Sequence, residues 1–386
     1  MAPLPILLLN PRPGIIDLGW GLPDPNLLPV DAVQRAVSTA LRRFGPDTLE
    51  YGCSAGPGPL LDWLITHINS QEGRMLTADE IMITGGNSFA LDLILSNCTK
   101  PNDTVIVESP TYHLAIQILR NHPLNLIPVP TDNDGIVVDA LAGLLRELKR
   151  VGRQACALYT IPTFSNPTGV SLSDNRRKEL VELASTEALL IIEDDVYRDL
   201  AYDLPASPSL WSIDPSGTTV RMGSFSKSLA PGLRLGWLTA SRSIISRIVG
   251  CGQLTSGGGT NHFTAMVVAM LCEAGDFDIS VAQLRKAYQA KRDALVSVLR
   301  EQLPEEFTFV TPAGGFFVWV RLPPYLSSRQ LLPHAEAAGV SFVPGPEFHL
   351  DKRGDDSFRL AFSYYSPKEL AQAAKRLGYS IRKLID

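Results

Sequence analysis

The stretch LLIIEDDVY, residues 189–197, is a short apolar run that ends in three consecutive acids. A run of this length, rich in leucine and isoleucine, is typical of a strand buried on both faces of a sheet. Segments with apolar residues at helical spacing, such as SFALDLILSNC (88–98) and RRKELVELAS (176–185), alternate with similar short runs along the chain. Those runs are EIMIT (80–84), TVIVES (104–109), ACALYTIP (155–162) and VRMGSF (220–225). The alternation predicts an α/β fold with a mostly parallel central sheet flanked by helices.

The C-terminal part of the chain has a different pattern. A long helical stretch at residues 283–303 precedes candidate strands at FTFV (307–310), GGFFVWVRL (314–322) and FRLAFS (358–363). Helices and strands in this order predict a smaller α+β domain. We therefore expect an N-terminal segment at residues 1–50, a large domain at 51–280 and a small C-terminal domain at 281–386.

Composition and charge argue against nucleic acid as a partner. The chain has 386 residues, of which 19% are charged, and a formal net charge of −5, whereas nucleic-acid-binding domains carry basic patches. The basic residues at 176–178 are followed by leucine and glutamate at helical spacing, and we interpret them as a solvated helix face.

The cysteines and the N-terminus indicate a cytoplasmic location. Five cysteines are scattered along the chain without a CxxC pair, which argues against a disulfide framework or a zinc site. The six histidines show no metal-ligand spacing either, so we expect no metal. The first 14 residues lack a basic region and have only a short apolar run, so we expect neither a signal peptide nor a membrane span.

Polar residues that could bind a ligand or take part in a reaction follow the predicted strands. They are Gly85 to Ser88, Tyr112, Asn166, Asp194 and the segment Ser224 to Lys227. Parallel sheets bind ligands at the carboxyl ends of their strands, so these residues are expected to share one site. A lysine buried there has a lowered pKa and can act as a nucleophile or base, although a lone loop lysine is more often simply exposed.

Two segments could together bind one anion. Gly86, Asn87 and Ser88 lie between a strand and a helix, where backbone N–H groups and the helix dipole favour a phosphate. Hydroxyls and a cation come from a second segment, at Ser224, Ser226 and Arg234. Neither segment has the GxGxxG or Walker pattern, so a dinucleotide or nucleotide site is not indicated.

The three acids of residues 193–195 should not all face the same way. Strand alternation sends Glu193 and Asp195 to one face of the sheet and Asp194 to the other. Asp194, with Tyr197 nearby, could then pair with a protonated ring nitrogen of a cofactor. The alternative is that these acids are helix caps or ion-pair partners.

A lysine, an anion site, a carboxylate, the amide in PTFSNPTG (162–169) and the aromatic residue in ESPTYH (108–113) suit one cofactor, pyridoxal phosphate. SFSK followed by Arg234, PTFSNPTG and EDDVY closely resemble motifs of the fold-type I, class I/II aminotransferases that depend on this cofactor. The sequence is most similar to the 2-aminoadipate and kynurenine aminotransferase branch. The resemblance runs from IDLGWGLPDPNLLP (16–29) to FRLAFSYY (358–365).

The resemblance implies a role for each matching position around the cofactor ring. It implies that Lys227 forms the internal aldimine and then moves the substrate proton, and that Asp194 pairs with the ring nitrogen. Asn166 and Tyr197 would bind the ring hydroxyl, and Tyr112 would stack on the ring. The phosphate would be held by Gly86, Asn87, Ser88, Ser224, Ser226 and Arg234.

The resemblance also implies a homodimer and a substrate site. Tyr51 matches the tyrosine that such enzymes lend to the phosphate of the neighbouring subunit, and residues 1–50 would pack with the small domain and at the dimer interface. Arg359 would bind the substrate α-carboxylate beside Asn166 and Gly21. Trp20 departs from the family pattern, and its indole could either fill space near the substrate or pack on the small domain.

Two further departures and two other functions stay open. Ser165 stands where a glutamine is common, and SGGGTNHF (256–263) is unusually rich in glycine, with His262 more often structural than catalytic in such a position. The resemblance implies transamination of an α-amino acid through internal and external aldimines. A pyridoxal-phosphate-dependent β- or γ-elimination or replacement enzyme is the alternative. A non-enzymatic ligand-sensing module would be expected to carry a DNA-binding region ahead of residue 16.

Overall fold

The computed structural model describes residues 12–385, and the expectations about residues 1–11 lie outside this range. An eight-stranded sheet forms the larger part, in the order β2-β9-β8-β7-β6-β3-β4-β5. Neighbours from β8 through β7, β6 and β3 to β4 are parallel, whereas β9 is antiparallel to β2 and β8. The strands span Ile81–Thr84, Thr104–Ser109, Asn125–Asp132, Gly135–Ile136, Ala155–Thr160, Leu190–Asp194, Thr219–Ser224 and Gly236–Thr239, from β2 to β9. The predicted α/β fold is confirmed.

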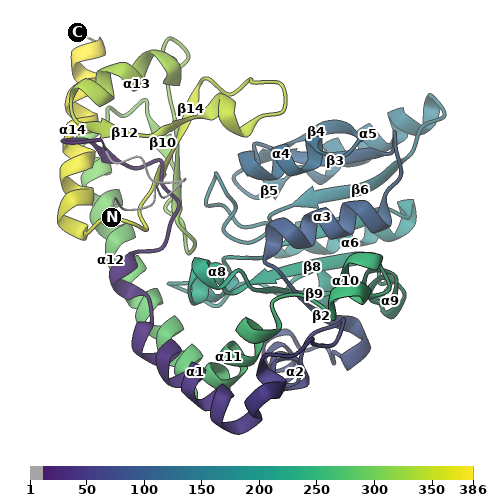
Figure 1. Ribbon diagram of the computed structural model, residues 1–386. Coiled ribbons are helices and arrows are strands. Elements are labelled where there is room, and N and C mark those ends of the chain that lie inside the picture. Colours follow the sequence, from purple (N-terminus) through teal and green to yellow (C-terminus); the bar gives the residue numbers. More distant parts are fainter. Residues whose placement is uncertain (1–11, 386) are drawn as a thin grey trace.

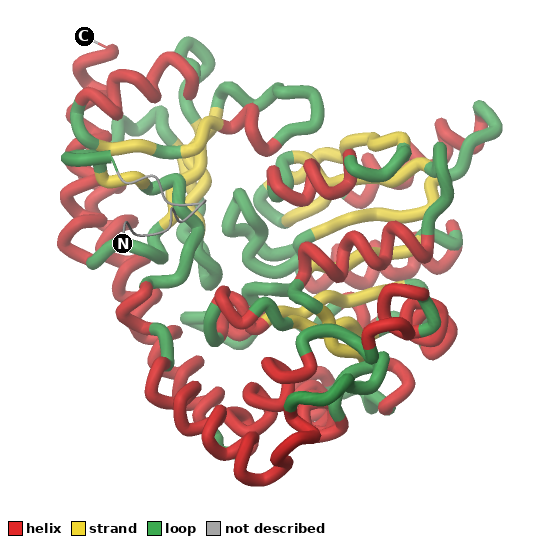
Figure 2. Tube along the Cα trace, viewed as in Figure 1, coloured by secondary structure: helices red, strands yellow, loops and turns green. Residues whose placement is uncertain are grey.

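Alternate side chains of the strands enter different hydrophobic clusters on the two faces of this sheet. In β7, Ile192 packs in the cluster that includes α3 (Asn87–Cys98), α4 (His113–Arg120) and α9 (Arg242–Val249). Its neighbour Ile191 packs with α5 (Val138–Arg150), α6 (Asp174–Glu187) and α7 (Leu210–Ile213). Helices therefore cover both faces, as Figure 2 shows around the strands.

A second, smaller unit contains most of the C-terminal third of the chain (Figure 1). Its antiparallel sheet has the order β10-β11-β14-β13 and lies with α13 (Ser328–Ala337) and α14 (Pro367–Ile385). Those strands are Thr308–Phe309, Phe317–Arg321, Ser357–Ala361 and Val343–Pro344. The short β1 (Ile16–Asp17) pairs in parallel with β12 (Val340–Ser341), so the start of the described chain joins this unit.

Three helices pack in one hydrophobic cluster with β2, the edge strand of the large sheet. They are α1 (Val30–Phe44), α2 (Gly58–Glu72) and α11 (His262–Glu273). The long helix α12 (Asp276–Gln302) starts in the same cluster, with Phe277 and Val281, and continues into the small unit from Leu284 onward. The remaining helices are the short α8 (Phe225–Ser228) and α10 (Gly252–Gly257).

The structure differs from the sequence analysis in several strands, such as β9 and β4, and on one helix face. Strand β4 was not predicted, because its sequence NLIPVPTD contains two prolines, which are usually confined to sheet edges. The interpretation of residues 176–178 as a solvated face was wrong for Arg177, which is 1% exposed and donates hydrogen bonds to the carbonyls of Leu172 and Pro162. Helical spacing alone did not show that this residue faces the sheet.

No helix within residues 12–385 is long and apolar enough to cross a membrane. The same residues contain no group of three or more histidine, cysteine or acidic side chains placed to hold a metal ion.

Candidate active site

Lys227 lies just beyond the carboxyl end of β8, on the short helix α8. The Ser224 hydroxyl caps this helix by accepting a hydrogen bond from the Ser226 N–H at 3.1 Å. The Lys227 ammonium donates to the Gly21 carbonyl at 3.1 Å and lies 5.6 Å from the centre of the Phe316 ring. Burial, followed by the positive charges of Arg359 and Arg234, lowers the pKa of Lys227 to about 8, and the charge of Asp194 partly opposes the shift.

Asp194 ends β7 and is 7% exposed. One of its oxygens accepts from the Asn87 amide at 2.8 Å, and the other accepts from the Tyr159 hydroxyl at 2.7 Å. Burial raises the pKa of Asp194, and these two donors oppose that rise. Tyr159 was missed by the sequence analysis, although it lies on β6, which directly neighbours β7.

The other two acids of β7 point away from Asp194, as the strand alternation predicted. Glu193 accepts from the backbone N–H groups of Leu210 and Trp211, at the start of α7. Asp195 accepts from Arg221 at 2.8 Å and also pairs with Arg198. The cap and ion-pair interpretation therefore applies to Glu193 and Asp195, and Asp194 is the carboxylate on the side of Lys227.

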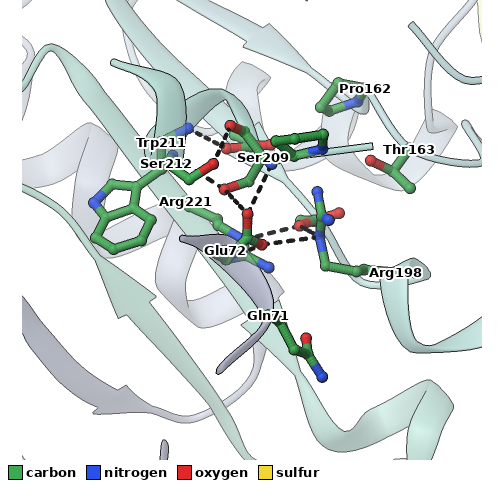
Figure 3. A network of polar contacts seen from close by, with 12 residues as sticks. Gln71, Glu72, Pro162, Thr163, Arg198, Ser209, Trp211, Ser212 and Arg221 are labelled. Atoms are coloured by element: carbon green, nitrogen blue, oxygen red, sulfur yellow. Dashed lines mark hydrogen bonds and ion pairs between the residues drawn. The ribbon is translucent and has the colours of Figure 1, made fainter. Parts of the chain in front are cut away.

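A buried ion-pair network lies on that opposite side (Figure 3). Arg221 contacts Glu72 at 2.9 Å as well as Asp195, and the Ser209 N–H donates to Glu72 at 2.9 Å. Burial by itself would raise the pKa of Asp195, but Arg198 and Arg221 lower it to about 2. The network joins α2 to the two strands that end at Asp194 and Ser224.

Arg221→Met should therefore destabilise the fold without touching the site directly. Removing one partner leaves Glu72 and Asp195 as buried carboxylates with too little positive charge, which costs about 3–5 kcal/mol. The free energy of unfolding in urea measures the effect. Arg242→Met is the matched control, because its ion pair with Asp79 is exposed to solvent and should contribute little to stability. Equal stability of the two variants would contradict this account of the network.

An anion cradle lies beside the start of α3. Gly86 precedes the helix with φ of 89°, and a Cβ there would lie 3.3 Å from a terminal nitrogen of Arg234. The helix N-terminus and the guanidinium thus lie close together, and a side chain at position 86 would crowd the guanidinium. Arg234 makes no ion pair within residues 12–385, and it has the strained φ of 46°.

The three serines expected to bind the phosphate lie on two different helices. Ser224 and Ser226 are on α8, next to Lys227, where the Ser224 hydroxyl proton remains free to donate. Ser88 is in the first turn of α3 with an exposed side chain. The Asn87 side chain points to Asp194 and not to Arg234, so only its backbone N–H, at the helix start, is directed toward the cradle.

Arg359 comes from β14 of the small unit and is 3% exposed. Its terminal nitrogens donate to the Asn166 side-chain oxygen at 2.8 Å and to the Gly19 carbonyl at 2.6 Å. The guanidinium also lies over the rings of Phe317 and Phe348, at 4.3 and 4.8 Å. Burial lowers the pKa of Arg359 to about 10, and the Arg359 Nε has no partner among the described residues.

Two tyrosines line the space between these groups. Tyr197 is buried and packs edge-on against Phe316 and Phe317, at 5.5 and 5.8 Å between ring centres. Tyr112 is half-buried before α4, and burial, followed by the charge of Asp194, raises its pKa to about 12. Both phenols are therefore neutral donors at physiological pH.

The remaining predicted residues are only partly gathered at this site. A Cβ at Gly21 would come 2.6 Å from the Phe317 ring, so any side chain at this position would force that buried ring to move. Trp20 stacks on Tyr365 at 6.2 Å and meets Tyr364 edge-on at 5.5 Å, which is packing on the small unit. Tyr51 is 84% exposed and does not reach the site of its own chain.

The glycine-rich run has a structural explanation. Side chains at Gly258 and Gly259 would collide with the backbone carbonyls of Gly52 and Cys53. His262 lies beside Gly52, with its Nε2 3.0 Å from the Asp47 carbonyl. The run thus packs closely on the loop that carries Tyr51.

The charges at the site test whether pyridoxal phosphate fits. Lys227 is close enough to Arg234, Arg359 and Asp194 for their charges to act on it, and the three cations outnumber that one carboxylate. A phosphate and a substrate carboxylate would balance these charges, and the missing side chain at Gly86 lets the start of α3 lie next to the Arg234 guanidinium, where a phosphate could meet both. A lysine amine, an anion site and a buried carboxylate thus lie together at the carboxyl ends of the strands. This combination is typical of the site of a pyridoxal-phosphate-dependent enzyme.

Comparisons with known proteins agree with this class. The family model of aminotransferase class I and II matches residues 14–377, and the chain belongs to this family. It is 33% identical to aromatic-amino-acid aminotransferase 1 of Thermococcus litoralis, covering 98% of this chain and 90% of that protein. It is 32% identical to 2-aminoadipate transaminase of Thermus thermophilus, with 98% and 93% covered.

A solved structure extends the comparison to the fold. The kynurenine aminotransferase of Pyrococcus horikoshii, solved with pyridoxamine phosphate (PMP), superposes with a TM-score of 0.92 at 34% identity, covering 97% of this chain and 92% of that one. The chain is thus a fold-type I aminotransferase that uses pyridoxal phosphate and acts on amino acids.

Proposed function

We propose that this aminotransferase binds its cofactor among Lys227, Asp194, Tyr112 and the Gly86 cradle, and the substrate carboxylate at Arg359. The observation that carries the proposal is that Lys227 and Arg359 are cations without a carboxylate partner among residues 12–385. Burying such charges is unfavourable unless a ligand compensates them. Pyridoxal phosphate, when bound, supplies an electron sink for the negative charge left at the substrate Cα.

Different residues of the chain would bind the cofactor and move the substrate proton. Lys227, with a pKa of about 8, attaches the cofactor and afterwards moves the proton at Cα. Asp194 keeps the ring nitrogen protonated, and Asn166 and Tyr197 donate to the ring oxygen. The phosphate is bound by Arg234 and by groups at the starts of α3 and α8, which are the Gly86 and Asn87 backbone and the hydroxyls of Ser88, Ser224 and Ser226. We assign the Asn87 side chain to Asp194 instead of the phosphate, because it donates there.

Tyr51 completes the site of a second subunit in this proposal, which makes the active form a homodimer. Its exposure of 84% leaves the ring free to enter a neighbouring chain, and the loop behind it is packed against Gly258 and Gly259.

We also propose a cytoplasmic location, in keeping with five free cysteines. For the units we keep boundaries at residues 50 and 280, since α12 changes cluster near Leu284.

The preferred substrate is proposed to be an α-amino acid with an aromatic or apolar side chain. Phe317 and Phe348 flank the guanidinium that receives the carboxylate, and Trp20 with Tyr364 and Tyr365 forms an aromatic group next to Gly21. The nearby Arg12 is already paired with Asp17 at 2.9 Å and Glu336 at 2.6 Å, which disfavours a distal substrate carboxylate.

Single-turnover reactions with a panel of amino acids test this function. We expect phenylalanine, tyrosine and leucine to convert the bound cofactor to its amine form and release the matching keto acid. Aspartate and glutamate should react more slowly. Release of ammonia with the cofactor left in its aldehyde form would instead support the elimination or replacement alternative.

The lowered pKa of Lys227 predicts how cofactor uptake depends on pH. Only the neutral amine attacks the aldehyde, so the rate constant for uptake by cofactor-free protein should rise with pH and level off above about 8. Stopped-flow absorbance measures this rate. A profile that keeps rising to pH 10 would mean that Lys227 has the pKa of an ordinary exposed lysine.

A further inference from the structure

Tyr159 is a fully buried residue whose hydroxyl contacts Asp194, the proposed partner of the cofactor ring nitrogen, and it has no role in the scheme above. It lies on β6 with 0% exposure, and its hydroxyl donates to Asp194 at 2.7 Å. The second oxygen of Asp194 accepts from Asn87, which also donates to the Met222 carbonyl at 3.2 Å. Each carboxylate oxygen of Asp194 is thus fixed by one donor from a different element.

The arrangement leaves Asp194 able to accept another hydrogen bond. A carboxylate has about four lone-pair positions, and Tyr159 and Asn87 use two of them. Both donors also stabilise the ionised form of Asp194 against the burial that disfavours it. Tyr159 is the stronger constraint of the two, because its ring is held by β6 in the core cluster with Ile192 and Ala157.

We infer that Tyr159 is a positioning residue that keeps Asp194 ionised and oriented, and so keeps the cofactor ring nitrogen protonated. The inference rests on the proposed role of Asp194. Without the Tyr159 hydroxyl, one oxygen of Asp194 would be buried without a donor and would hold a proton more tightly. The proton shared with the ring nitrogen would shift toward the carboxylate, and the ring would become a weaker electron sink.

Nitrogen-15 NMR of holoenzyme loaded with ring-labelled pyridoxal phosphate reports the ring protonation directly, without turnover. In the wild type we expect the resonance of a protonated ring at neutral pH. In Tyr159→Phe we expect it to move toward the unprotonated position, with kcat lower by about ten- to a hundredfold and KM near the wild-type value. Tyr288→Phe is the matched control, since Tyr288 is equally buried and its hydroxyl accepts from the Asp24 N–H, away from Asp194.

A fluorinated tyrosine at position 159 keeps the shape of the site if Tyr159→Phe fails to fold. Its more acidic phenol is a stronger donor, so the ring-nitrogen resonance should move the other way, toward fuller protonation. An unchanged resonance in either variant, or the same shift in Tyr288→Phe, would overturn the role of Tyr159. An unprotonated ring in the wild type would instead refute the proposed role of Asp194 itself.

Discussion

Lys227→Ala loses about 10⁴-fold in kcat for transamination, the largest effect that we expect from any single substitution in this chain. The variant lacks both the amine that attaches the cofactor and the base that moves the substrate proton. Its fold should persist, because within residues 12–385 the Lys227 side chain has a single hydrogen bond, to the Gly21 carbonyl, and its burial as a cation is unfavourable. Steady-state kinetics, with circular dichroism to verify folding, measures the loss.

Two comparison variants distinguish the reactivity of the Lys227 amine from its positive charge. Lys227→Arg keeps the cation but cannot attack an aldehyde, so it should be as inactive as Lys227→Ala. Lys286→Ala removes an exposed lysine and should leave kcat unchanged. Small alkylamines added to Lys227→Ala should restore part of the rate by acting as the base. Substantial activity in Lys227→Arg would show that the lysine serves only as a charge.

Arg359→Leu should reduce kcat/KM for α-amino acids by about 10²- to 10⁴-fold. The guanidinium can offer two charge-assisted hydrogen bonds to a carboxylate, and each contributes about 1.5–3 kcal/mol. Arg359→Lys keeps the charge without the planar fork and should recover only part of the loss. The measurement is kcat/KM for phenylalanine in the three proteins.

The matching amine without a carboxylate, phenethylamine, is the control substrate for this prediction. Its slow reaction should be nearly the same in wild type and Arg359→Leu, since the missing contact is one that it never makes. The preference for phenylalanine over phenethylamine would then collapse in the variant. If both substrates slowed equally, Arg359 would be acting on the fold or the cofactor and not on the carboxylate.

Local patterns in the sequence were sufficient to place much of the sheet and several of the site residues. The apolar run at 189–197 predicted both a buried strand and the separation of Asp194 from Glu193 and Asp195, because side chains alternate strictly along a strand. Lys227 and Asn166 were placed by motifs directly after strands, where the topology gathers them. These are short-range features that the sequence itself contains.

Contacts between distant segments could not be predicted in the same way. The bond from Tyr159 to Asp194 depends on how β6 and β7 align, and no spacing along the chain encodes that alignment. Likewise, helical periodicity did not reveal that Arg177 faces the sheet. The side chain of Asn87 points to Asp194 because α3 packs on the sheet face that includes Ile192. This is a tertiary contact, and the sequence around Gly86 does not reveal it.

Borohydride reduction of the holoenzyme, followed by peptide mass mapping, shows which lysine carries the cofactor. Reduction fixes the cofactor to whichever lysine holds it, and the mass of the labelled peptide identifies that residue. We expect one pyridoxyl phosphate group per chain, on the peptide that contains Lys227, and none in Lys227→Ala. A label on another lysine, or no label after incubation with excess pyridoxal phosphate, would contradict it.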